Sequence, residues 1–172
     1  MIIINKRNLF FLISVWLLST LLSAQNVTIS TPHTQLLLSV PNGGTPEQLY
    51  YGSRTSDADI RSICETARRR NAYPVYGMGY PCETALSVRH ADGNLTLQMA
   101  VIGVKETRLT KENATLTVIE LKDKVYPFFV NICYKAWQDA DVIETWTEIR
   151  HEEKKPVQLQ QFASAYLPVR RG

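Results

Sequence analysis

The sequence predicts an all-β domain, an antiparallel β-sandwich. Short runs of alternating polarity, rich in β-branched and aromatic side chains, are separated by clusters of Gly, Pro, Asn and Asp, which is the pattern of strands joined by turns. No crossover helices recur between these runs, so we expect the strands to pair antiparallel. The longest runs carry apolar side chains on both faces, as in a sheet that is covered twice.

The N-terminal segment has the order of a secretory signal. Lys6 and Arg7 precede an apolar-rich run over residues 9–22, and Ser23-Ala24 follow it. The run has 14 residues, fewer than the roughly 20 that a membrane-spanning helix needs. We therefore expect a signal peptide over 1–24 and an exported mature domain over 25–172, with no membrane association after cleavage. An uncleaved N-terminal anchor is the alternative.

The charge of the mature segment is close to balanced. Removing residues 1–24 takes away two of the 19 Lys and Arg residues and none of the 16 Asp and Glu residues. Nucleic-acid binding needs positive charge clustered on one face, so no nucleic-acid partner is expected. The remaining length suits one domain.

Nine strands are expected between the turn clusters. In chain order they cover 27–30, 36–40, 48–51, 85–90, 95–104, 115–121, 128–137, 142–151 and 157–167. The Asp92-Gly93 turn lies between two of these alternating runs, which predicts that 85–90 and 95–104 form a hairpin.

One segment, 56–70, has helical rather than strand periodicity. Ser56 is a suitable N-cap, Asp59 follows three residues later, and apolar residues recur at helical spacing from Ile60. We expect a short helix or ordered loop inserted between strands, and long connections of this kind are often functional.

No constellation of residues in the sequence predicts chemistry by itself. His33, His90 and His151 lie in unrelated segments, and no nucleophile, phosphate-binding or zinc motif is present. We therefore expect no cofactor and no metal. Two acidic pairs are candidates for glycosidase carboxyls. They are Asp57 with Asp59, which also suit a helix N-terminus, and Asp139 with Asp141, which also suit a turn.

The aromatic residues allow two interpretations. Tyr50, Tyr51, Tyr73, Tyr76, Tyr80, Trp137 and Trp146 could stack on sugar rings, or they could fill a core or an interface.

Three cysteines, Cys64, Cys82 and Cys133, allow one disulfide and one free thiol in an exported chain. Cys64 and Cys82 are the first pair to test because they flank one irregular region. The alternative is that all three are buried as small apolar residues.

Five stretches in order resemble the N-terminal domain of glycoside hydrolase family 36, the α-galactosidase or melibiase family. They are LYYGSR at 49–54, YPVYGMG at 73–79, ALSVRHADG at 85–93, DVI at 141–143 and the segment 156–167. The resemblance implies a β-supersandwich that precedes a (β/α)8 barrel, and the barrel of the family carries an Asp nucleophile and an Asp acid/base in a retaining reaction.

Nothing in the sequence matches the barrel motifs, so the chain is expected to be a fragment whose sandwich is incomplete at the C-terminus and which carries no catalytic residue of its own. The resemblance implies three partners: an α-galactoside, the enzyme's own barrel, and further subunits of a homo-oligomer. The loop after LYYG-x-R reaches the barrel mouth in the family. By region, this makes Asp57, Asp59, Arg68 and Arg69 candidates for the substrate rim. A stand-alone exported carbohydrate-binding or adhesion sandwich is the alternative function.

Overall fold

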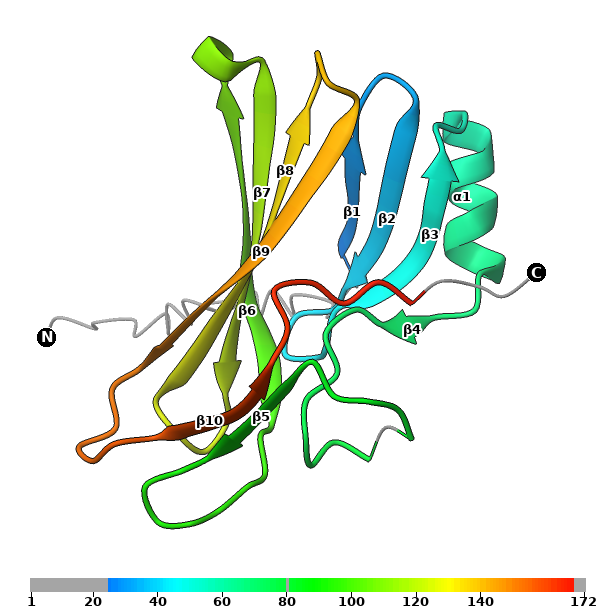
Figure 1. The fold of residues 1–172 in the computed structure, drawn as a ribbon. Helices are drawn as coiled ribbons and strands as arrows, with labels where there is room; N and C mark the ends of the chain where they lie inside the picture. The colour runs from blue at the N-terminus through cyan, green and yellow to red at the C-terminus, as the bar shows by residue number, and fades with distance from the viewer. Residues whose placement is uncertain (1–24, 80, 169–172) are drawn as a thin grey trace, which may run out of the picture.

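A computed structural model describes residues 25–79 and 81–168 (Figure 1). The predicted signal peptide, residues 1–24, lies outside the described residues.

Two four-stranded sheets and a two-stranded ribbon make up the fold. The first sheet has the order β1 (Gln25–Ser30), β2 (Thr34–Val40), β3 (Glu47–Ser53) and β4 (Arg70–Asn71). The second has the order β6 (Met99–Leu109), β7 (Ala114–Asp123), β8 (Phe128–Trp137) and β9 (Val142–His151), and the ribbon pairs β10 (Gln158–Phe162) with β5 (Leu86–Arg89). Every strand pair in these sheets is antiparallel, so the predicted antiparallel β-sandwich is confirmed.

The two large sheets face each other, and the ribbon closes one end of the space between them (Figure 1). One α-helix, α1 (Asp57–Thr66), lies beside β3 on the outer side of the first sheet. A 3-10 turn, η1 (Thr110–Glu112), joins β6 to β7. Within the described ranges no helix is long and apolar enough to cross a membrane.

The core forms because the strands alternate. On β8 the side chains of Phe128, Val130, Ile132, Tyr134 and Ala136 all point inward and are buried. Leu36 and Leu38 of β2 and Leu86 of β5 belong to the same buried cluster. Burial of such side chains supplies about 25 cal/mol per Å² of apolar surface, so one cluster holds both sheets and the ribbon together.

The outer face of β8 is partly covered by cations. The Arg150 guanidinium lies 4.1 Å from the ring centroid of Phe129, and the Lys135 ammonium lies 3.8 Å from that of Trp137. Cations over aromatic faces are attracted by the ring quadrupole, so the rings of Phe129 and Trp137 are each covered on one face by a cation of the same sheet.

The predicted hairpin between 85–90 and 95–104 is wrong. The turn itself forms, with the amide of His90 donating to the carbonyl of Asn94 at 2.8 Å, but β5 pairs with β10 instead. The strand after the turn begins only at Met99. The chain is diverted because the Gln98 amide donates to the buried carboxylate of Asp123 at 2.5 Å, and because the Leu97 amide donates to the carbonyl of Tyr76.

A buried acid–base pair holds the ribbon end of the sandwich. His90 Nδ1 lies 2.7 Å from Glu153 Oε1, and neither side chain is more than 7% exposed. The imidazole of His90 stacks on Tyr126 with 3.7 Å between ring centroids. These contacts join the turns after β5, β7 and β9, which are far apart in sequence.

Candidate functional site

The candidate site is built on β3, whose backbone has a β-bulge. Leu37 pairs with Tyr50 and Leu38 pairs with Gln48, so Leu49 is the extra residue in β3. A bulge breaks the strict alternation of side chains and re-aims those around it. As a result Gln48, Leu49, Tyr50 and Tyr51 all contribute to one groove.

Gly52 explains the glycine of the LYYGSR segment. A Cβ at this position would lie 2.7 Å from the Tyr50 hydroxyl oxygen and 3.0 Å from its Cζ. The Tyr50 side chain therefore lies over Gly52, and its hydroxyl donates to the carbonyl of Ser53 at 2.8 Å. Because Gly52 has no side chain, the Tyr50 ring can lie in this position.

Arg54 anchors the end of this segment to the first hairpin. Its amide donates to the carbonyl of His33 at 2.7 Å, and its guanidinium lies 3.5 Å from the carbonyl of Thr31. These contacts hold the backbone in place just before α1.

The groove lies between β3 and the C-terminal half of α1 and has a volume of about 600 Å³. Its walls combine aromatic, cationic and amide groups: Gln48, Leu49, Tyr50, Tyr51, Ile63, Thr66, Ala67, Arg68, Arg70 and Pro168. Pockets of this size commonly hold small ligands, and aromatic faces with amide and guanidinium donors suit a polyhydroxylated ligand.

Asp57 and Asp59 lie at the other end of α1, in its first turn after the N-cap Ser56. The Ser56 hydroxyl accepts from the Asp59 amide at 3.2 Å and donates to Asp59 Oδ2 at 2.6 Å. Both acids are exposed in the first turn, where the helix dipole favours negative charge. The predicted helix and its N-cap are confirmed.

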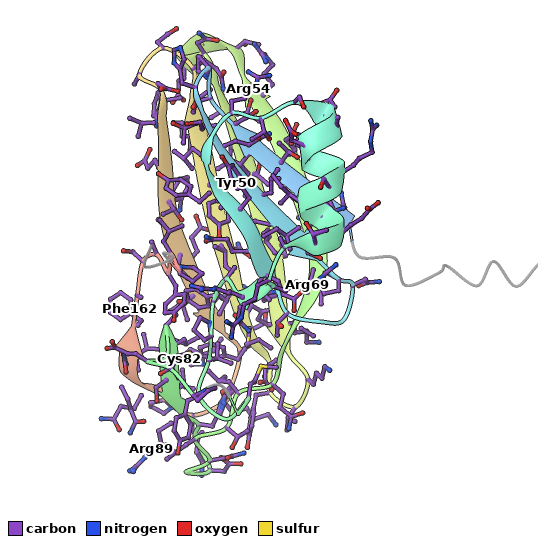
Figure 2. All side chains as sticks on the ribbon, turned by 90° about the vertical axis from the view of Figure 1, so that its right-hand side faces the viewer. Tyr50, Arg54, Arg69, Cys82, Arg89 and Phe162 are labelled. Carbon is purple, nitrogen blue, oxygen red and sulfur yellow. The ribbon has the colours of Figure 1, made fainter. Side chains whose placement is uncertain are left out.

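The two arginines of the predicted rim have different environments. Arg68 lines the groove. Arg69 is tied to the first sheet, because its Nη1 donates to Ser39 Oγ at 2.8 Å and lies 3.2 Å from Glu47 Oε2. Figure 2 shows Arg69 below the C-terminal end of α1.

The four predicted rim residues are thus not gathered at one point. A helix of ten residues is about 15 Å long, and it separates the acids from the arginines. No local pattern in the sequence indicates that Gln48 or Pro168 lines the groove. Pro168 is brought there by a long-range bond, in which Gln48 Nε2 donates to its carbonyl at 3.3 Å.

The second acidic pair, Asp139 with Asp141, stabilises turns, which is the structural alternative that the sequence allows for it. Asp141 accepts hydrogen bonds from the Thr31 hydroxyl at 2.5 Å and from the His33 amide at 3.0 Å, and these bonds lower its pKa. Asp139 accepts from the Asn113 amide group at 2.6 Å. Both acids hold turns at one end of the sandwich.

The three cysteines are free thiols in the structure. The Cys64–Cys82 bridge, the first pair to test, is therefore not formed in the structure. Cys64 is half-buried, Cys82 is exposed and Cys133 is buried. Among residues 25–79 and 81–168, no group of three or more His, Cys, Asp or Glu side chains is arranged to hold a metal ion.

The fold is shared with several solved α-galactosidases. The α-galactosidase of Lactobacillus brevis superposes with a TM-score of 0.71 at 17% identity, over 83% of this chain and 23% of that one. A family 36 α-galactosidase of Geobacillus stearothermophilus in complex with raffinose gives 0.72 at 15% identity, over 81% and 24%. The galactosidase domain of an α-galactosidase–sucrose kinase gives 0.68 at 21% identity, over 80% and 24%.

The chain thus spans about a quarter of the length of these structures. No curated protein matches it. Residues 44–172 match the family model described as the glycosyl hydrolase family 36 N-terminal domain. This match covers most of the sequence, including the bulged strand, α1 and the whole second sheet. The chain therefore belongs to the glycosyl hydrolase family 36 N-terminal domain family.

Proposed function

We propose that this chain is the N-terminal domain of an exported α-galactosidase that hydrolyses terminal α-galactosides with retention of configuration. The observation that carries the proposal is the family match over residues 44–172. The likeness to solved α-galactosidases, of which the chain spans about a quarter, supports the same assignment.

In this proposal the chemistry belongs to a separate (β/α)8 barrel. Retaining hydrolysis needs two carboxyl groups about 5 Å apart on either side of the scissile bond. The acids that the sequence indicates serve other purposes: Asp57 and Asp59 lie in the first turn of α1, where the helix dipole favours them, and Asp139 and Asp141 hold turns. The domain would then support the barrel.

The groove between α1 and β3 would form part of the substrate rim, in the enzyme's own active site or in that of a neighbouring subunit of a homo-oligomer. Tyr51 is 49% exposed at its edge and can stack on a sugar ring. Arg68 and Gln48 supply hydrogen-bond donors for hydroxyl groups. Asp57, Asp59 and Arg69 are more distant members of the same rim.

An antibody raised against residues 25–168 tests the proposal with the native protein. The exported fraction of the host is passed over the immobilised antibody, and the hydrolysis of an aryl α-galactoside is measured before and after. A preimmune column is the control. The proposal predicts that the antibody removes the activity, and that the captured polypeptide begins at Gln25.

Two outcomes would overturn the proposal. Capture of the polypeptide with all of the activity left in the flow-through would assign the chain to the alternative, an exported carbohydrate-binding or adhesion sandwich. Recovery of the polypeptide only from the intracellular fraction would contradict the proposal that the protein is exported.

A further inference from the structure

A second pocket lies on the outer face of the other large sheet, away from α1. Its volume is about 260 Å³. It is lined by Ile102, Glu120, Leu121, Phe129, Asn131, Glu148, Ile149 and Arg150. This is smaller than the roughly 300–1,000 Å³ of pockets for drug-sized ligands, so the pocket suits a single small ring.

The polar wall of the pocket is formed by side chains that lie opposite one another on three neighbouring strands. Glu120 of β7, Asn131 of β8 and Glu148 of β9 are paired in register, so their side chains share a face. Two strand spacings, about 10 Å, separate the backbones of Glu120 and Glu148. Gly103 pairs with Glu120, and a Cβ there would lie 2.9 Å from Glu120 Oε2, so the missing side chain makes room for this carboxylate.

Glu148 is held in place on both of its oxygens. Trp146 Nε1 donates to Glu148 Oε1 at 3.2 Å, and Asn131 Nδ2 donates to Oε2 at 3.1 Å. An exposed glutamate usually keeps its rotamer freedom, which costs free energy to remove on binding. Here neutral donors on a rigid sheet have already fixed the carboxylate, and its remaining lone pairs can accept hydrogen bonds.

The charges around the pocket disfavour an ionic ligand. Lys105 Nζ donates to Glu120 Oε1 at 2.6 Å, and Arg150 lies over the Phe129 ring with Glu152 as its ion-pair partner. A phosphate would meet the carboxylates of Glu120 and Glu148, and a metal ion would meet Lys105 and Arg150. A neutral ligand with several hydroxyl groups can donate to the carboxylates and accept from the cations.

We propose that this pocket binds one ring of a neutral pyranose sugar. Hydroxyls on opposite sides of the ring donate to Glu148 and Glu120 and accept from Arg150, while its apolar edge packs on Ile102, which is 55% exposed. The site is separate from the α1–β3 groove and does not depend on the α-galactosidase assignment.

Fluorine NMR of the full polypeptide, labelled with fluorotryptophan, tests the proposal. Trp146 contacts the pocket through Glu148 and reports binding locally, and its resonance is assigned with Trp146→Phe. Methyl α-galactoside and methyl α-glucoside are titrated separately. We expect a saturable shift of the Trp146 resonance with at least one of them.

Variants separate this pocket from other sites. Glu148→Gln and Asn131→Ala should each raise the dissociation constant about tenfold or more, because each removes a group that binds or fixes a hydroxyl partner. Glu144→Gln is the matched control: Glu144 accepts from Trp137 Nε1 at 2.9 Å on the same strand and face but does not line the pocket, so it should leave binding unchanged.

Three results would overturn the inference: no saturable shift with either sugar, a shift that survives both pocket variants in folded protein, or equal loss in Glu144→Gln. A shift that is lost only in Tyr51→Ala would place the sugar in the α1–β3 groove, which contradicts this inference and leaves the proposed function standing.

Discussion

Thr31 and Asp141 are 110 residues apart in sequence, yet the Thr31 hydroxyl donates to Asp141 Oδ1 at 2.5 Å. Thr31 lies in the turn between β1 and β2, and Asp141 lies in the turn between β8 and β9. The bond therefore ties the first sheet to the second at the end of the sandwich opposite the ribbon (Figure 1).

Asp141→Asn is predicted to lower the thermal midpoint of unfolding in a pH-dependent way. Asparagine tolerates the positive φ of 54° at this position but loses the charge that the Thr31 hydroxyl and the His33 amide favour. Those bonds lower the pKa of Asp141 from its ordinary 3.8. The stabilisation is therefore fully present above pH 3.8 and is lost as the pH falls through the lowered value.

Thermal scans of both proteins across this range measure the effect. The difference in midpoint should be largest near neutral pH and should shrink in acid. Asp139→Asn is the control, because Asp139 holds only the Asn113 side chain at 2.6 Å. A difference that does not change with pH would show that the carboxylate charge has no part in the contact.

Gly52→Ala is predicted to disturb the groove more than the fold. The new methyl group would displace the Tyr50 ring, at a cost of about 1–3 kcal/mol in the free energy of unfolding. If the groove forms part of the substrate rim, KM for an α-galactoside should rise roughly tenfold in the full-length protein through misplacement of the groove wall. Tyr50→Phe keeps the ring and removes only the bond to Ser53, so its effect should be smaller. An unchanged KM in Gly52→Ala would show that the groove is not part of the substrate rim.

The thiols should differ in reactivity. Cys82 is exposed and should be alkylated first, while burial raises the pKa of Cys133 to about 11 and should keep it unreacted until the protein is denatured. Alkylation of unreduced protein followed by peptide mass analysis measures this. If neither Cys64 nor Cys82 is labelled before reduction, the two would instead form the disulfide that the sequence allows.

Residues 25–172 without further chain should associate at micromolar concentration. On β10, Phe162 is 64% exposed and Leu159 is 45% exposed, and Figure 2 shows Phe162 at the margin of the molecule. β10 is paired with β5 along one edge, and exposed apolar groups on an edge strand promote pairing with other chains. The double variant Leu159→Ser with Phe162→Ser should sediment with a lower average mass. A stable monomer of the unsubstituted chain would mean that this surface needs no partner.

The sequence predicted the regular parts of the fold well, because alternation over ten residues leaves little ambiguity. The strands over 128–137 and 142–151 were placed to the residue, and Ser56 was correctly predicted as the cap of α1. The Asp92-Gly93 turn was also found, but its hairpin was not, since pairing was decided by the buried carboxylate of Asp123 on a distant strand.

The candidate site was predicted only in part for the same reason. Helical periodicity located α1, and Arg68 was singled out with it. The bulge at Leu49 and the arrival of Pro168 depend on partners that no local pattern reveals. Arg69 was assigned to the rim by region, and its bonds to Ser39 and Glu47 became visible only once the strands were paired.

Hydrolysis of an aryl α-galactoside tests the central claim most directly, with two samples compared: purified residues 25–172, and the native polypeptide captured through this domain. The account predicts no turnover by the first and turnover by the second, because the two carboxyl groups of a retaining enzyme come from the barrel. Turnover by residues 25–172 that is abolished by replacing a single acid, such as Asp57 or Asp59, would contradict it, as would a native polypeptide that has no activity.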